Sequence, residues 1–243
     1  VVIALRCAYQ GSIAPLPLYQ LGNEAAMKRD MVKGNFLNGD IYIMFAAICT
    51  FLGLYFLLQF IFPPHERTNL FYALAMLFLA FYLAELGTTV WPFRAPWIRA
   101  IARASLLFSM FLLLPFFIEF FDILRKKWIY ASCFFICFVF LVFFLVLSGD
   151  ETKLMAIFSL TCTLVFIPIL TEAVICVIAL RKGNSEGGIV LVAIVIGITL
   201  ALHDASYTMK GSSPFVWMQG FAFFGLNISI FITLAMRQAS MKK

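Results

Sequence analysis

The run IYIMFAAICTFLGLYFLLQFIF fills residues 41–62 and holds no charged side chain. About 20 predominantly apolar residues are enough for an α-helix to cross the hydrocarbon core of a bilayer. The whole chain has the same character, because 63% of its 243 residues are hydrophobic and only 12% are charged. Soluble domains are roughly half apolar and one quarter charged. The composition therefore predicts an integral membrane protein whose first partner is the lipid bilayer.

Seven segments are long and apolar enough to span a membrane, namely residues 41–62, 69–90, 98–121, 128–147, 154–180, 189–209 and 215–236. The joints between them are too short to fold on their own. The sequence therefore predicts one all-α domain over residues 38–243, a bundle of seven transmembrane helices with antiparallel neighbours. Pro115 and Pro168 lie inside two of the segments, and we expect a kink at each because proline removes a backbone hydrogen bond.

The distribution of lysine and arginine predicts which helix ends face the cytoplasm, because cytoplasmic joints carry an excess of these residues. With the N-terminus outside, nine basic residues fall on the cytoplasmic side: Arg67, Arg125, Lys126, Lys127, Arg181, Lys182, Arg237, Lys242 and Lys243. Five fall on the outer side: Arg94, Arg99, Arg103, Lys153 and Lys210. We therefore expect an outer N-terminus and a cytoplasmic C-terminus. The same flanking role accounts for the net charge of +6, so we expect no nucleic-acid partner.

Residues 1–37 differ from the rest of the chain. The opening VVIALRCAY is rich in β-forming residues and is far shorter than a membrane span. It also lacks the basic start and the cleavage site of a signal peptide. The chain begins at Val1 and not at a methionine. We interpret residues 1–37 as the remnant of an extracytoplasmic sensor domain and its linker to the first span.

Ionisable side chains inside membrane helices are costly, so each needs a partner or water. At a rise of about 1.5 Å per residue, four helices bring polar groups to one depth in the outer half of the bundle. The sequence predicts a polar cluster there, acting as a structural network or as a switch, made of Glu85, Arg103, His203, Asp204, Tyr207 and Gln219. Neighbouring residues on a helix point about 100° apart, so we expect Asp204, and not His203, to face Arg103.

Two further carboxylates lie closer to the inner ends of their helices. Glu119 precedes Arg125 by a short stretch, and Glu172 precedes Arg181. We expect both carboxylates to be interfacial groups beside those basic residues.

The chain offers no complete catalytic, cofactor-binding or metal-binding set. The pair His203–Asp204 resembles the metal ligands of some phosphohydrolases, but those need further histidines. The only other histidine, His65, lies in a joint at the opposite face, which also excludes a haem held by two histidines. Cys133 and Cys137 are one helical turn apart, with no histidine close in sequence to complete a zinc site. The last span holds no lysine for retinal. We expect no enzyme activity, no cofactor and no metal.

Several motifs resemble those of the bacterial seven-transmembrane receptors with diverse intracellular signalling modules. In that family a His-Asp pair closes the sixth helix, as in ALHDASYTM at residues 201–209. The seventh helix opens on a glycine–phenylalanine stretch and ends in a basic run, which is similar to QGFAFFGLNISIFITLAMRQ at residues 219–238. The stretch NGDIYIMFAAICTFLGLYFLLQF, residues 38–60, looks like the family's first span.

The resemblance implies a receptor membrane domain that couples an extracytoplasmic sensor to a cytoplasmic effector such as a kinase, a cyclase or a diguanylate cyclase. It implies three kinds of partner: a small-molecule or carbohydrate ligand of the outer domain, the effector domain, and a second copy of the chain in a homodimer. It also implies location in a bacterial inner membrane. The alternative is a transporter or channel that uses the outer-half polar cluster as its site. Transporters often contain internal repeats, and none is convincing here, which favours the receptor.

Overall fold

The computed structural model describes residues 32–63, 65–88, 95–123, 126–209 and 216–241, so residues 1–31 of the expected sensor remnant lie outside it. The described part consists of helices joined by short turns. In chain order these are η1 (Phe36–Asp40), a π-helical turn that continues into α2 (Ile41–Ile61), then α3 (Arg67–Gly87), α4 (Pro96–Phe120), α5 (Lys127–Leu147), α6 (Glu151–Leu164), α7 (Phe166–Arg181), α8 (Glu186–Met209) and α9 (Gln219–Met241).

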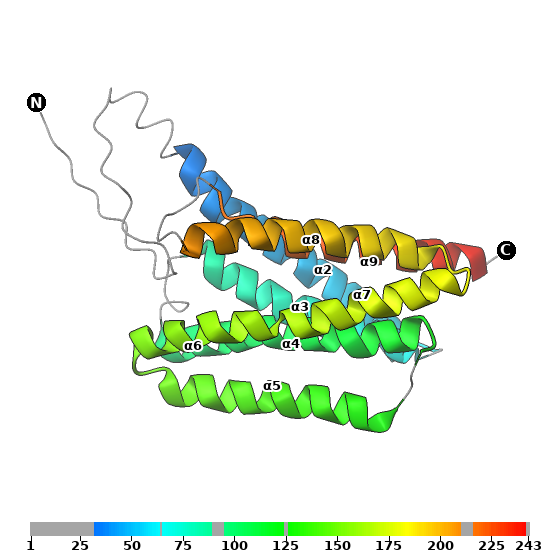
Figure 1. The fold of residues 1–243 in the computed structure, drawn as a ribbon, viewed down its shortest axis with the longest axis horizontal. Helices are drawn as coiled ribbons and strands as arrows, with labels where there is room; N and C mark the ends of the chain where they lie inside the picture. The colour runs from blue at the N-terminus through cyan, green and yellow to red at the C-terminus, as the bar shows by residue number, and fades with distance from the viewer. Residues whose placement is uncertain (1–31, 64, 89–94, 124–125, 210–215, 242–243) are drawn as a thin grey trace, which may run out of the picture.

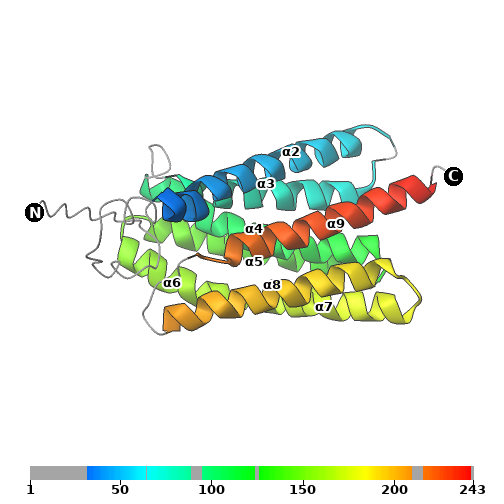
Figure 2. The same cartoon turned by 90° about the horizontal axis from the view of Figure 1, so that it is seen from above.

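The helices run up and down along one axis, as Figures 1 and 2 show. One end of the bundle gathers the start of α2, the end of α3, the end of α8 and the start of α9; we call it the proximal end. The opposite end, where α2, α7 and α9 finish, is the distal end. The expected antiparallel bundle is therefore confirmed.

Six of the seven expected spans are single helices long and apolar enough to cross a membrane: α2, α3, α4, α5, α8 and α9. The remaining segment, residues 154–180, is divided into α6 and α7, of 14 and 16 residues, at Val165. Pro168 has no N–H to donate to the carbonyl of Leu164, so the helical ladder is interrupted there. At Pro168 the helical hydrogen bonding is interrupted, although Val165 keeps right-handed helical backbone angles, whereas α4 runs through Pro115 without interruption. In Figure 1, α6 and α7 follow one another across the bundle and together complete the seventh crossing.

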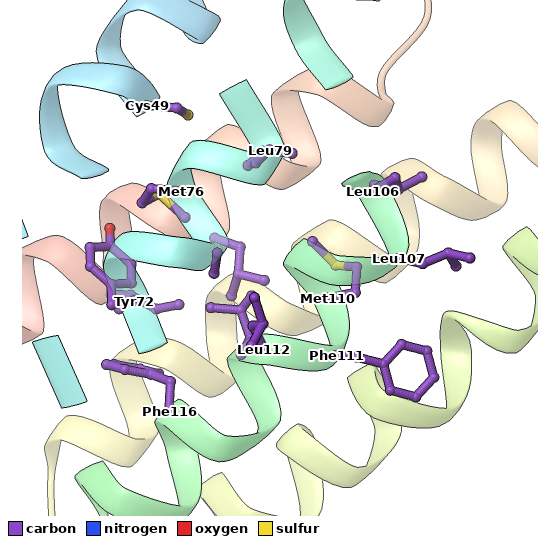
Figure 3. Packing of buried hydrophobic residues seen from close by; sticks show 14 of the residues in the cluster. Cys49, Tyr72, Met76, Leu79, Leu106, Leu107, Met110, Phe111, Leu112 and Phe116 are labelled. Atoms are coloured by element: carbon purple, nitrogen blue, oxygen red, sulfur yellow. The ribbon is translucent and has the colours of Figure 1, made fainter. Parts of the chain in front are cut away.

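Helix α4 forms the centre of the bundle. It is buried on nearly all sides, and it packs against α3, α5 and α7. Figure 3 shows side chains of α3 and α4, among them Tyr72, Met76, Met110 and Phe116, within one apolar cluster. Helix α5, at the edge of the bundle in Figure 1, instead turns large side chains such as Phe135 and Val146 outward. A helix that is apolar all round suits either the core or lipid.

Small residues allow α2 and α3 to approach closely at the proximal end. A Cβ added to Gly87 would lie 2.7 Å from Cγ1 of Ile43 and 2.9 Å from the carbonyl oxygen of Gly39. Such small-residue contacts are common where membrane helices pack, because lipid supplies no hydrophobic force that favours one helix pairing over another. The first turns of α2 are therefore fixed against the end of α3.

Candidate functional site

Arg103 and Glu85 form an ion pair between α4 and α3. The Nη2 of Arg103 lies 3.2 Å from Oε1 and 3.1 Å from Oε2 of Glu85, and the two side chains are only 2% and 7% exposed. The guanidinium also lies 4.8 Å from the ring centroid of Phe158 on α6 and 5.7 Å from that of Tyr82. Opposite charges and aromatic faces together offset the cost of burying Arg103 in the membrane.

Asp204, near the end of α8, caps the start of α9. Its Oδ1 accepts the N–H of Met218 at 3.0 Å, and its Oδ2 accepts the N–H of Gln219 at 2.7 Å. The first N–H groups of a helix have no partner within the helix, and the helix dipole favours a negative charge at that end. The carboxylate of Asp204 therefore joins α8 to α9 across the connection between them.

His203 and Tyr207 complete this capping group on the α8 side. His203 Nδ1 lies 3.0 Å from Asp204 Oδ1, and the rings of His203 and Tyr207 have centroids 4.9 Å apart. His203 is partly exposed, whereas Asp204 is buried. Gln219 takes part through its backbone N–H. The carboxylate of Asp204 thus contacts the imidazole of His203 as well as the backbone at the start of α9.

Trp217 connects the same region to the start of α2. The hydroxyl of Tyr42 donates to the carbonyl oxygen of Trp217 at 2.9 Å, and the N–H of Trp217 donates to Oδ1 of Asn38 at 3.2 Å. A Cβ on Gly220 would collide with the Tyr42 ring, so the ring lies directly on the first turn of α9. We call Asn38, Tyr42, Asp204 and Trp217 the proximal latch, because their hydrogen bonds join α2, α8 and α9.

The structure divides the six expected cluster residues into two groups. Arg103 pairs with Glu85, so the expected pair of Arg103 with Asp204 is wrong. Helices α3 and α4 pack along their length, which brings Glu85 to Arg103, while α8 packs on α9 and delivers Asp204 to its start. His203, Asp204, Tyr207 and Gln219 do lie together.

Sequence reasoning missed Asn38, Tyr42 and Trp217. Two of the contacts of this group use the backbone of Trp217, which no side-chain pattern reveals. The one available signal is Gly220 at the opening of the last helix, since a glycine there permits the close approach of the Tyr42 ring.

The two carboxylates expected at the interface behave differently. Glu119 is partly exposed near the distal end and accepts a hydrogen bond from the Tyr130 hydroxyl at 2.9 Å; its expected neighbour Arg125 lies outside the described residues. Glu172 is completely buried, and neither of its oxygens has a hydrogen-bond partner. The expectation that Glu172 lies at the interface beside Arg181 is therefore wrong.

In the part of the chain that the structure describes, no three His, Cys, Asp or Glu side chains gather in a way that suits a metal ion.

The comparison with protein families gives one match. The family described as 7TM diverse intracellular signalling matches residues 39–238, which is most of the chain and includes both polar groups. No curated protein and no solved structure matches the chain. The match agrees with the helical bundle, with its apolar spans, and with a transmembrane domain of the receptor-signalling type. The chain belongs to the 7TM diverse intracellular signalling family.

Proposed function

We propose that the chain is the membrane domain of a bacterial inner-membrane receptor, and that it transmits a signal from an outer sensor before α2 to a cytoplasmic effector after α9. The observation that carries this proposal is the proximal latch. The segment that enters α2 is hydrogen-bonded to Trp217, immediately before α9, and α9 then crosses to the distal end. A displacement of the start of α2 therefore acts directly on the helix that leads out of the bundle.

Aromatic contacts below the latch support the same route. The ring of Phe45 on α2 stacks on that of Phe224 on α9, with centroids 4.2 Å apart and an interplanar angle of 10°. It also meets Phe221 edge-on at 5.3 Å. Rigid aromatic pairs of this kind resist independent sliding of the two helices. Signal transmission needs a physically connected element with two arrangements, and the α2–α9 pair supplies the connection.

The orientation that this proposal needs has the proximal end outside. It is supported by the excess of lysine and arginine at the distal joints and the C-terminal tail, nine against five. The outer sensor would take a small-molecule or carbohydrate ligand, and two copies of the chain would form the signalling unit. The chain itself would carry out no catalysis.

A chimeric receptor tests the proposal. A domain with a known ligand is fused before α2, and a reporter kinase is fused after Lys243. We expect kinase output to follow the outer ligand. Each latch hydrogen bond contributes about 1 kcal/mol, so Tyr42→Phe should lower the ligand-induced response about fivefold.

Tyr55→Phe is the matched control, because Tyr55 lies on the exposed face of the same helix and contacts Gln59. It should leave the response intact. Output that ignores the ligand, or an equal loss in both variants, would contradict coupling through the latch.

The transporter alternative is less well supported. A substrate site needs polar groups available to the substrate, whereas Arg103 and Glu85 neutralise one another in the core. Liposomes that contain the chain should show no uptake of ions or small solutes above that of empty liposomes. Saturable uptake abolished by Glu85→Gln would favour the transporter.

A further inference from the structure

Glu172 is the one carboxylate of the described residues that is completely buried with both oxygens unpartnered. It lies in α7, nine residues before Arg181, which is about 14 Å along the helix from that basic end. The buried residues of α7 are Pro168, Glu172, Ile175, Cys176 and Ala179. Their spacing of three and four residues makes a single stripe, so Glu172 lies on the face of α7 that packs into the bundle.

No charged side chain in the described residues compensates Glu172. Two thiols lie within electrostatic range of Glu172, those of Cys133 on α5 and of Cys176, one turn further along α7. Helix α4 carries three charged groups: Arg99 is partly exposed in its first turn, Arg103 is paired with Glu85, and Glu119 accepts a hydrogen bond from Tyr130.

The facing surfaces of the other two neighbours are equally poor in charge. The described buried side chains of α6 are Leu154, Phe158 and Thr161. On α8 they are Val190, Ala193, Ile194 and Asp204. The carboxylate of Asp204 accepts a hydrogen bond from the backbone at the start of α9. The surroundings of Glu172 are therefore apolar or weakly polar.

An ionised carboxylate without a counter-charge or hydrogen bonds is strongly disfavoured in such surroundings, whereas the neutral acid is tolerated. Ionisable residues at membrane depth commonly mark proton relays or ion paths. The packed bundle is therefore compatible with Glu172 only in its protonated form. Ionisation requires that the side chain first reach water.

The break between α6 and α7 provides a way for this to happen. Val165 lies between the two helices with helical backbone angles, and Pro168 has no N–H to complete the hydrogen-bond ladder across it. Glu172 follows the break by seven residues, about 10 Å along α7. Interrupted membrane helices are often found where transported ions and coupling protons bind. A proline that removes a hydrogen bond from the ladder is also a point at which a helix can bend.

We propose that Glu172 is a proton-binding site, occupied when α7 is packed and emptied when α7 turns about the break at Val165. In the emptying step the O–H bond of the carboxylic acid breaks, and the proton passes to water while the electron pair stays on the carboxylate. The packed arrangement of α7 therefore binds one proton more than the turned arrangement. This inference does not depend on the receptor proposal.

Infrared spectroscopy of the whole chain in nanodiscs tests the site directly. A protonated carboxylic acid has a C=O stretching band well separated from the carboxylate bands. At neutral pH we expect such a band in the wild type and in Glu119→Gln, and its loss in Glu172→Gln. An identical spectrum in wild type and Glu172→Gln would overturn the proposal. Should Glu172→Gln fail to accumulate, Glu172→Met, which suits the apolar surroundings, takes its place.

Thiol labelling tests the movement. Cys176 on α7 and Cys49 on α2 are both completely buried, so their alkylation by a membrane-permeant maleimide reports local opening. If opening releases one proton, the open population rises about tenfold per pH unit. The rate ratio of Cys176 to Cys49 should therefore rise with pH in the wild type and stay flat in Glu172→Gln. A ratio equally dependent on pH in both proteins would show that no proton at Glu172 controls α7.

Discussion

Arg103 is the largest side chain that the described part of the bundle buries almost completely, and its environment depends on a single carboxylate, that of Glu85. The ion pair adds little net stability, because the cost of removing two charges from water nearly equals the energy of their attraction. We expect the pair instead to select one packing of the two helices, by fixing the rotation of α4 against α3. At the residue scale, removal of one member and removal of both should therefore have different consequences.

Glu85→Gln should lower the free energy of unfolding by about 3–5 kcal/mol, because it leaves the guanidinium of Arg103 uncompensated. The double variant Glu85→Gln/Arg103→Met should recover most of that loss. Thermal unfolding in one detergent measures both, with Glu66→Gln, an exposed position just before α3, as the control. A double variant as unstable as the single one would show that Arg103 has a role other than pairing.

Asp204→Ala should lower the free energy of unfolding by about 1–2 kcal/mol, since it leaves the N–H groups of Met218 and Gln219 without their acceptor. Asp204→Asn keeps one acceptor oxygen and should lose less. Ser206→Ala, which alters an exposed hydroxyl on the same turn, should be neutral. The same unfolding assay ranks the three variants, and a neutral Asp204→Ala would contradict the capping role.

At the scale of the elements, hydropathy predicts the spans but not their partners. Each segment is predominantly apolar, and in lipid only a helix satisfies the hydrogen bonds of the backbone within one such segment. The partners of Arg103 could not be predicted in this way. Glu85 and Asp204 lie at a similar depth, and only the rotation and order of the helices distinguish them. Depth alone would have corrected the expectation for Glu172, because nine residues place it well away from Arg181.

The break between α6 and α7 should depend on Pro168. Pro168→Ala restores an N–H that can donate to the carbonyl of Leu164, so the two helices should join into one. Hydrogen exchange measured by mass spectrometry should then show slower exchange in peptides that cover residues 164–170. Pro115→Ala is the matched control, since α4 is already continuous there. Unchanged exchange in Pro168→Ala would show that the break has another cause.

At the scale of the whole molecule, the basic residues that flank the spans predict the topology. A reporter that is active only in the cytoplasm, fused after Lys243, should give signal, because the excess of lysine and arginine at the distal joints predicts a cytoplasmic distal end. A reporter active only in the periplasm should be silent at the same position. The reverse pattern would invert the bundle and place the proximal latch in the cytoplasm.

The purified chain should hydrolyse neither phosphodiesters nor peptides. His203 is engaged with Asp204 and Tyr207 near the end of α8, whereas the second histidine, His65, lies in the joint between α2 and α3, so we expect no joint action of the two. Assays with model substrates should give the same background for the wild type and for His203→Ala. Turnover that disappears in His203→Ala would identify an active site that these residues do not suggest.

Because α4 and α5 differ in exposure, the thickness of the membrane should affect how these two helices pack. Helix α4 is enclosed by protein, whereas α5 is exposed over most of its surface and packs mainly against α4. The 21 residues of α5 measure about 32 Å, close to the thickness of a typical hydrocarbon core. In a thinner bilayer α5 must tilt, while α4 is shielded from the mismatch. Acyl-chain length should therefore alter the α4–α5 crossing angle before any other, which spin labels on the two helices would measure.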